Sequence, residues 1–254
     1  MSALEKKLLH NAGRAIADYK MIRTGDKVLA CLSGGKDSFA MINLLRLLKM
    51  HSHDKFSLLV LMVDAGIPGW HSDLMIKWLE EKKLPYNVLK QNIYEIVQSK
   101  SHLGSTDCML CSRLRRGSIY TYAKKNDFVK IALGHHRDDL IVSLLMSIFY
   151  NGEIRSMPPK MLTDDERHIV IRPLVYAQEK DLANYAAQEQ FPIISNKLCM
   201  GKESVMRKKI HALIATLAQE NPKIPSNMLH ALQKISPSQL MDHNWWDFKT
   251  MNNE

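Results

Sequence analysis

Cysteine is scarce in this chain, and long apolar runs are absent. Only four of the 254 residues are cysteine, and a chain of this length buries its core without disulfides or structural metals. No segment approaches the roughly 18 unbroken apolar residues of a membrane helix. The first 22 residues mix charges at helical spacing and lack the apolar run of a signal peptide. We therefore expect a cytoplasmic protein with no membrane partner.

Acidic residues are in deficit. Asp and Glu total 26 against 35 Lys and Arg, which leaves a net charge of +9. This excess favours an anionic partner such as a nucleic acid or a nucleotide. The basic residues also gather beside cysteines: one cluster spans 113–116, after a Cys-x-x-Cys pair, and another spans 202–209, after Cys199.

Short apolar runs alternate with segments of helical spacing. The runs are unbroken and of strand length, as in strands buried on both faces of a parallel sheet. They predict an α/β fold, a Rossmann-like parallel sheet flanked by helices. From about residue 200 the pattern turns helical, so we expect one domain over 1–198 and a helical C-terminal extension over 199–254. The predicted strands are 27–32, 56–64, 129–134 and 168–174, with a weaker one at 86–91.

The hexapeptide SGGKDS follows the first predicted strand and opens a helix, where a parallel sheet places its ligands. Gly34 and Gly35 allow the backbone to approach an anion closely, and the free N–H groups of the helix start bind phosphate. Lys36 adds a positive charge, while Ser33 and Ser38 add hydroxyl donors. The other interpretation is an ordinary tight turn between a strand and a helix.

Asp37 is the unusual member of this loop, because a carboxylate repels phosphate unless a cation such as Mg²⁺ bridges them. Two common phosphate motifs are excluded. Walker A requires a glycine where the chain has Ala30 and a Ser or Thr where it has Asp37, and the G-x-G-x-x-G pattern is absent.

The block GHHRDD follows the strand 129–134 and begins a helix, so it belongs at the same edge of the sheet as SGGKDS. Asp138 and Asp139 suit the first turn of a helix through its dipole alone. His135 and His136 are adjacent, and adjacent side chains at a strand end point apart, which argues against a shared metal.

Cys108 and Cys111 have the spacing of metal ligands, yet a zinc ribbon requires a second such pair, which the chain lacks. Cys31 lies inside an apolar strand and is expected to be buried. Together with Cys199, the pair suits an iron–sulfur cluster with one open iron better than tetrahedral zinc. A redox pair and two free thiols in a loop stay open as alternatives.

SGGKDS resembles the PP-loop of the N-type ATP pyrophosphatases, which cleave ATP between its α and β phosphates and adenylate a substrate oxygen. From about residue 20 to residue 200, the chain resembles the tRNA 2-thiocytidine synthetases. After SGGKDS, the motifs that carry this resemblance are, in order, CMLCSRLRRG, ALGHHRDD, MPPK, IVIRPL and FPII…LC. Asn196 stands where some relatives have a further cysteine, and the C-terminal part matches less well. The resemblance places Asp64 near adenosine, although a polar strand end explains Asp64 equally well.

The resemblance also implies roles for individual residues. The catalytic residues that it implies are Lys36, Asp37, Asp138 and Asp139. The ATP-binding residues are Ser33, Gly34, Gly35, Lys36, Asp37, Ser38 and Asp64. The ligands of a 4Fe-4S cluster, whose fourth iron can carry sulfide, are Cys108, Cys111 and Cys199. The RNA-binding residues are Arg113, Arg116, Lys160 and Arg172. Arg113 and Arg116 share a helix face while Arg115 points elsewhere, so at least one of the three arginines is expected to be structural.

The implied reaction is ATP- and Mg²⁺-dependent thiolation of cytidine 32 in the tRNA anticodon loop. The C2 oxygen of cytidine attacks the α phosphate, and cluster-held sulfide then displaces AMP. The implied partners are tRNA, a source of sulfide derived from a cysteine desulfurase, a reductant of unknown identity and a second copy of the chain. Lysine ligation to a tRNA cytidine is an alternative that requires no cysteine pair. A non-catalytic iron–sulfur RNA-binding protein is another, and it requires no intact SGGKDS.

Overall fold

A six-stranded sheet with the order β3-β2-β1-β4-β6-β5 forms the centre of the molecule. All neighbouring strands are parallel except β5, which pairs with β6 in the antiparallel direction. The strands are β1 (Lys27–Leu32), β2 (Ser57–Asp64), β3 (Tyr86–Lys90), β4 (Lys130–Ala132), β5 (Lys160–Leu162) and β6 (Ile169–Ile171). This computed structural model describes residues 1–51, 55–70, 72–100, 108–194, 202–245 and 247–250.

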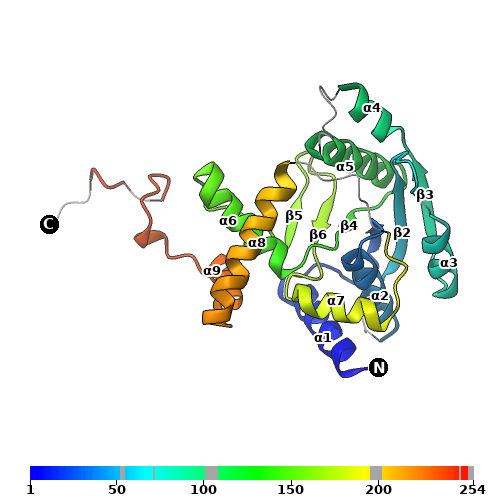
Figure 1. Ribbon diagram of the computed structural model, residues 1–254, viewed down its shortest axis with the longest axis horizontal. Coiled ribbons are helices and arrows are strands. Elements are labelled where there is room, and N and C mark those ends of the chain that lie inside the picture. Colours follow the sequence, from blue (N-terminus) through cyan, green and yellow to red (C-terminus); the bar gives the residue numbers. More distant parts are fainter. Residues whose placement is uncertain (52–54, 71, 101–107, 195–201, 246, 251–254) are drawn as a thin grey trace.

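Helices cover both faces of the sheet (Figure 1). The helices α1, α2, α3 and α7 lie on one face, and α5 lies on the other with α4 beside it. The first six helices are α1 (Ala3–Asp18), α2 (Lys36–His51), α3 (Asp73–Glu81), α4 (Ile93–Lys100), α5 (Cys108–Lys125) and α6 (Arg137–Asn151). The others are α7 (Glu179–Gln188), α8 (Lys202–Glu220), α9 (Ile224–Gln233) and the short 3₁₀ helix η1 (Pro237–Gln239).

The alternation of side chains along β1 explains its unbroken apolar sequence. Val28 and Ala30 face the large core shared with α1, α2 and α7. Leu29 points the other way and packs against Ile119 and Ala123 of α5. A strand covered on both faces has no position for a polar residue, and this is why β1 and β2 were predicted from the sequence.

The predicted α/β fold is confirmed, with all five predicted strands present and β4 and β6 shorter than expected. The strand β5 was not predicted. It has three residues, follows Pro158 and Pro159, and is placed by pairing with β6. So short a strand carries no apolar alternation, and its pairing partner decides its conformation.

The helical C-terminal segment packs against α6 and not against the sheet. Ile210 and Ile214 of α8 contact Ile141 and Val142 of α6, and in Figure 1 these helices extend sideways from the sheet. The predicted boundary at residue 198 lies outside the described residues, so the division into two domains stays a prediction. Among the described helices, none has the length and apolar character required to span a membrane.

Candidate active site

The phosphate-loop sequence lies where the chain changes direction across the sheet. From β1 the chain proceeds to β2 and β3 on one side, and β4 pairs with the other side of β1. In open parallel sheets, ligands bind at the carboxyl ends of strands beside such a switch point. SGGKDS follows β1 and GHHRDD follows β4, so both face this crevice, as the sequence predicts.

The phosphate loop is shaped by its own hydroxyl groups. The hydroxyl of Ser38 accepts from the backbone N–H of Ser33 at 3.2 Å and donates to the carbonyl of Gly35 at 2.8 Å. Gly34 has a φ of 86°, in the left-handed region that favours glycine. The N–H of Ile194 donates to the carbonyl of Gly34 at 2.9 Å, so the chain toward Cys199 leaves the described region beside this loop.

Gly134 brings the two motifs into contact. A Cβ atom at this position would lie 3.1 Å from the backbone of Asp37 and of Ser38. Real Cβ atoms seldom approach backbone so closely, so a glycine is required for GHHRDD to pack on the first turn of α2.

Asp37 has one satisfied oxygen and one that lacks a donor. Its Oδ2 accepts from Lys36 Nζ at 3.1 Å, and its Oδ1 lies 3.8 Å from His136 Nε2. Within the described residues, Oδ1 is buried without a hydrogen-bond partner. Burial raises the pKa of Asp37, and His136 and Lys36 offset only part of that rise. A buried carboxylate oxygen with no donor fits a cation such as Mg²⁺.

Asp138, by contrast, has donors on both oxygens. Arg137 donates to Oδ1 at 2.9 Å, and the backbone N–H of Glu179 donates to Oδ2 at 2.8 Å. Although burial raises the pKa of Asp138, His136 and Arg137 hold it well below its usual range. This carboxylate therefore joins the start of α6 to the start of α7, and a role in chemistry stays a prediction.

His136 is surrounded by carboxylates. Its Nε2 lies 3.4 Å from Asp139 Oδ2, which also accepts from the backbone N–H of His136 at 3.1 Å. Burial lowers the pKa of His136, but Asp138, Asp139 and Asp37 together raise it above its ordinary value. Sequence reasoning weighed His136 only as half of a metal pair and missed this contact with Asp37.

His135 has the opposite character. Its Nδ1 accepts a hydrogen bond of 3.2 Å from Arg172 Nε, and a guanidinium can only donate. Burial and the Arg172 charge lower the pKa of His135 to about 4. The surroundings of the two histidines therefore shift their pKa values in opposite directions, and the two side chains do not converge on one metal.

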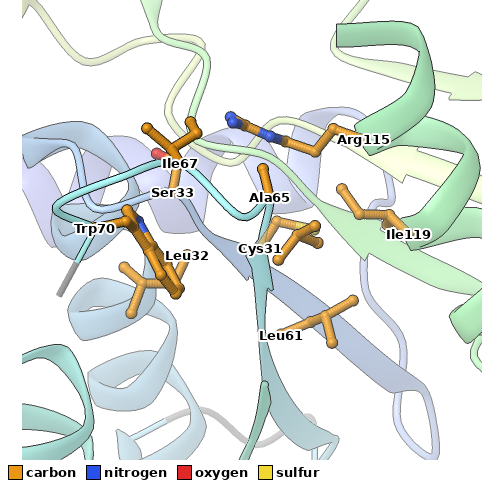
Figure 2. Close-up of a pocket in the computed structure, with 10 residues that line it drawn as sticks. Cys31, Leu32, Ser33, Leu61, Ala65, Ile67, Trp70, Arg115 and Ile119 are labelled. Atoms are coloured by element: carbon orange, nitrogen blue, oxygen red, sulfur yellow. The ribbon is translucent and has the colours of Figure 1, made fainter. Parts of the chain in front are cut away.

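The loop after β2 closes the other side of the crevice. Asp64 accepts from the N–H of Gly66 at 2.9 Å and so shapes this loop, as a polar strand end does. A cavity of about 40 Å³ lies between the ends of β1 and β2 and helix α5. Figure 2 shows its residues: Cys31, Leu32, Ser33, Leu61, Val63, Ala65, Ile67, Trp70, Arg115 and Ile119. Cys31 was predicted to be buried, but it is half-buried at the wall of this cavity. Its desolvated surroundings raise the pKa of the thiol to about 12.

The cysteine pair occupies the first turn of α5. Cys108 begins the helix, and Cys111 follows one turn later as a free, half-buried thiol. Cys111 packs against the apolar cluster formed by Ala65 and Ile67 of the loop after β2 and by Ile93 and Val97 of α4. Cys199 lies outside the described residues. The pair is therefore helical and beside the crevice, and not in a separate loop.

The four predicted RNA-binding residues divide into two kinds. Arg113 and Arg116 are exposed on α5. Lys160 Nζ donates to the carbonyl of Lys20 at 2.8 Å and so caps the chain after α1. Arg172 is 6% exposed and donates to the carbonyl of Pro158 as well as to His135. In this conformation the contacts of Lys160 and Arg172 are structural, and an RNA role for any of the four stays a prediction.

Known proteins share both the sequence motifs and the fold of this chain. The family model described as a PP-loop domain matches residues 4–197. The fold resembles that of the U34-tRNA thiolase NcsA from Methanococcus maripaludis, solved with its 4Fe-4S cluster. The TM-score is 0.71 at 18% identity, over 92% of this chain and 80% of that chain, and such a likeness concerns the fold alone. The chain is thus a PP-loop protein.

Relatives of much higher identity define the family more narrowly. The tRNA-cytidine(32) 2-sulfurtransferase of Legionella pneumophila (strain Corby) is 57% identical, over 98% of this chain and 88% of the relative. The protein of the same name from Coxiella burnetii (strain RSA 493) is 53% identical, over 98% of this chain and 97% of the relative. The chain belongs to the family of tRNA-cytidine(32) 2-sulfurtransferases.

Proposed function

We propose that this chain uses ATP to convert cytidine 32 of tRNA to 2-thiocytidine. One observation carries the proposal: the phosphate loop and the cysteine-bearing helix α5 line one cavity at the carboxyl edge of the sheet. Cys111 packs against a cluster that contains Ala65 and Ile67, two residues that line this cavity, which supports a sulfur site beside the phosphate loop. The relatives of 50% identity or more carry the same activity in their names.

ATP binds with its β and γ phosphates on the start of α2, where free N–H groups and the helix dipole favour anions. Lys36 contacts the departing pyrophosphate once it leaves its present partners, Asp37 and Glu179. Mg²⁺ is held by Asp37, whose Oδ1 lacks a donor among the described residues. The adenosine lies against the loop after Asp64.

The proposed reaction consists of two successive displacements. The C2 oxygen of the cytosine attacks the α phosphorus of ATP, the bond to the bridging oxygen breaks, and pyrophosphate leaves with its electron pair. Sulfide then attacks C2, and the C2–O bond breaks to release AMP. Positive groups fixed near the transferred phosphoryl group stabilise charge that develops in the first step. Asp139 and His136 act here by holding Asp37 in place.

A 4Fe-4S cluster held by Cys108, Cys111 and Cys199 is part of the proposal. Cys108 and Cys111 occupy positions one turn apart at the start of α5. Cysteine thiolates are the ligands that such clusters use. When bound, the cluster supplies an open iron site for the incoming sulfide. The sulfide comes from a cysteine desulfurase, and the reductant is a separate partner.

The RNA approaches over the exposed face of α5. The net charge of +9 and the exposed guanidinium groups of Arg113 and Arg116 favour a phosphate backbone. A single-stranded anticodon loop can present an unstacked base to the crevice.

A homodimer is also proposed, and the exposed apolar side chains of Phe149 and Ile154 after the buried part of α6 support a surface for a second copy.

The direct test is nucleoside analysis of tRNA after incubation with the anaerobically purified protein, ATP, Mg²⁺ and sulfide. We expect 2-thiocytidine, AMP and pyrophosphate from the wild type. Asp37→Asn and Cys199→Ser should form no 2-thiocytidine and should bind tRNA as tightly as the wild type. A lysine adduct on the cytidine would support the lysine-ligating alternative. Tight tRNA binding without any AMP release would support a non-catalytic RNA-binding protein.

Iron and sulfide analysis tests the cluster separately. The wild type should hold about four irons and four sulfides per chain, and Cys199→Ser should lose them. Cys31→Ser is the matched control, because the thiol of Cys31 lines the cavity without being a proposed ligand. Zinc in the wild type, or equal iron content in the three proteins, would refute this ligand set.

A further inference from the structure

Arg115 is the basic residue of α5 that faces the candidate active site. It stands four residues after Cys111, so the two side chains lie on one face of the helix. Figure 2 shows its guanidinium extending from α5 toward Ser33 and Ile67 across the cavity. Arg113 lies about 200° around the helix from Arg115, and both Arg113 and Arg116 are exposed.

The charge of Arg115 has no partner in the described part of the chain. Its Nε is buried without an acceptor, and it forms no ion pair with a described carboxylate. Lys36 has carboxylate partners in Asp37 and Glu179. Arg137 pairs with Asp138, although its Nε, like that of Arg115, lacks an acceptor among the described residues. A buried Nε–H group without an acceptor is unfavourable unless a ligand supplies one. The expectation that at least one of the three arginines is structural does not by itself explain why Arg115 faces this cavity.

The place of the cavity indicates which anion Arg115 meets. Ser33 belongs to the phosphate loop, and Ala65 and Ile67 belong to the loop assigned to adenosine. The α phosphate is the part of ATP that joins the phosphate tail to the nucleoside. The cavity volume of about 40 Å³ exceeds the roughly 10–15 Å³ that one water requires, so a phosphoryl oxygen fits beside the guanidinium.

We propose that Arg115 binds an oxygen of the α-phosphoryl group, first in ATP and then in the adenylated cytidine. This inference rests on the proposed function and adds a residue to it. The planar guanidinium can donate two parallel hydrogen bonds to phosphate oxygens, which a lysine cannot do. Arg115 thereby retains the AMP group beside the cysteine-bearing turn until sulfide displaces it.

Binding of three small probes tests the assignment without any catalysis. AMP contains only the α phosphate, adenosine contains none, and pyrophosphate occupies the phosphate loop alone. We expect Arg115→Gln to weaken AMP binding about 10- to 100-fold, the range for one charge-assisted hydrogen bond. Adenosine and pyrophosphate should bind as they do to the wild type, measured by NMR titration of the purified chain.

Two further variants separate the contact of Arg115 from effects of charge and of folding. Arg115→Lys retains the charge and the length, and it should weaken AMP binding by less than Arg115→Gln with an unchanged melting temperature. Lys124→Gln removes one exposed charge from the last turn of the same helix and should leave the binding of all three probes unchanged. In single-turnover reactions, Arg115→Gln should also slow pyrophosphate release about 10²- to 10³-fold.

The outcomes separate this proposal from the proposed function. Unchanged AMP affinity in Arg115→Gln refutes the contact, and so does an equal loss for AMP, adenosine and pyrophosphate. A wild type that binds no adenine nucleotide overturns both the contact and the ATP site. A wild type that binds AMP through Arg115 but never forms 2-thiocytidine overturns the thiolation proposal alone.

Discussion

At the scale of single residues, the site contains two aspartates with opposite environments. Asp37 is buried with one oxygen lacking a donor, and burial raises its pKa. Asp138 has donors on both oxygens, and its pKa is held below the usual range although burial opposes this. The first carboxylate therefore costs stability in the absence of a ligand, and the second contributes stability.

This contrast predicts the stability of two isosteric variants. Asp138→Asn loses the ion pair with Arg137 and should lower the free energy of unfolding by about 1–3 kcal/mol. Asp37→Asn should leave that free energy unchanged or raise it, because a buried charge is removed. Urea unfolding of the two variants beside the wild type measures both values. Equal destabilisation of the two would contradict the assigned environments.

The raised pKa of His136 predicts a dependence of stability on pH. The folded state holds this proton more tightly than the unfolded chain, because Asp37, Asp138 and Asp139 surround the imidazole and outweigh its burial. The bound proton of His136 makes its full contribution to the free energy of unfolding below about pH 6.5, the ordinary pKa of histidine. This contribution is lost as the pH rises through the raised pKa of the folded state. The difference in unfolding free energy between the wild type and His136→Gln should therefore shrink from pH 6 to pH 9.

Urea unfolding at a series of pH values checks this expectation. His10→Gln, on the exposed surface of α1, is the matched control for the loss of an imidazole. A difference for His136→Gln that grows with pH would show that the carboxylates do not stabilise the protonated imidazole.

At the scale of elements, the site depends on the close approach of two helix starts. The turn before α6 packs against the first turn of α2 at Gly134. Asp138 joins α6 to α7 across 41 residues of sequence. The positions of Lys36, Asp37 and His136 are thus set by three helix N-termini that meet at one edge of the sheet.

Gly134→Ala tests this approach. The added Cβ would meet backbone atoms at 3.1 Å, and backbone cannot yield as a flexible side chain does, so we expect a loss of about 1–3 kcal/mol in unfolding free energy. Gly117→Ala in α5 meets nothing within 4 Å and should stabilise the helix by about 0.5–1 kcal/mol. Thermal unfolding of both variants gives the comparison, and a neutral Gly134→Ala would refute the close contact.

At the scale of the whole molecule, the sheet separates two surfaces. The helices α1, α2 and α7 cover one face, and α5 covers the other with its two exposed arginines (Figure 1). The helices α8 and α9 lie against α6, beside the sheet. An RNA that reaches the crevice over α5 therefore meets one face of the molecule and leaves the α1 face free.

This asymmetry predicts how tRNA binding responds to salt. In Arg113→Gln/Arg116→Gln, the slope of log affinity against log salt should decrease in magnitude by about 1.4–1.8, two contacts at about 0.7–0.9 each. Lys6→Gln/Lys49→Gln removes two exposed charges from the α1 face and should leave the slope unchanged. Filter binding at several salt concentrations measures both. Equal slopes for the two double variants would place the RNA elsewhere.

The sequence by itself determined the class of fold, the central strands and the phosphate loop. Each depends on a local signal: unbroken apolar runs for β1 and β2, and glycines with hydroxyls between a strand and a helix for SGGKDS. Because parallel strands place their carboxyl ends at one edge, the sequence also indicated that SGGKDS and GHHRDD meet. The spacing of Cys108 and Cys111 indicated a metal or redox site, and the family resemblance added the predicted 4Fe-4S ligand set and the substrate.

Only the tertiary structure decided which charged groups are already paired and which are available to ligands. Lys160 is bound by a carbonyl 140 residues away, and Asp138 by an N–H 41 residues away. The position of Arg115 in the cavity depends on the packing of α5 against β1 and β2. Such partners come together only when the chain folds, because hydrogen bonds and ion pairs act over a few ångströms whatever the separation in sequence.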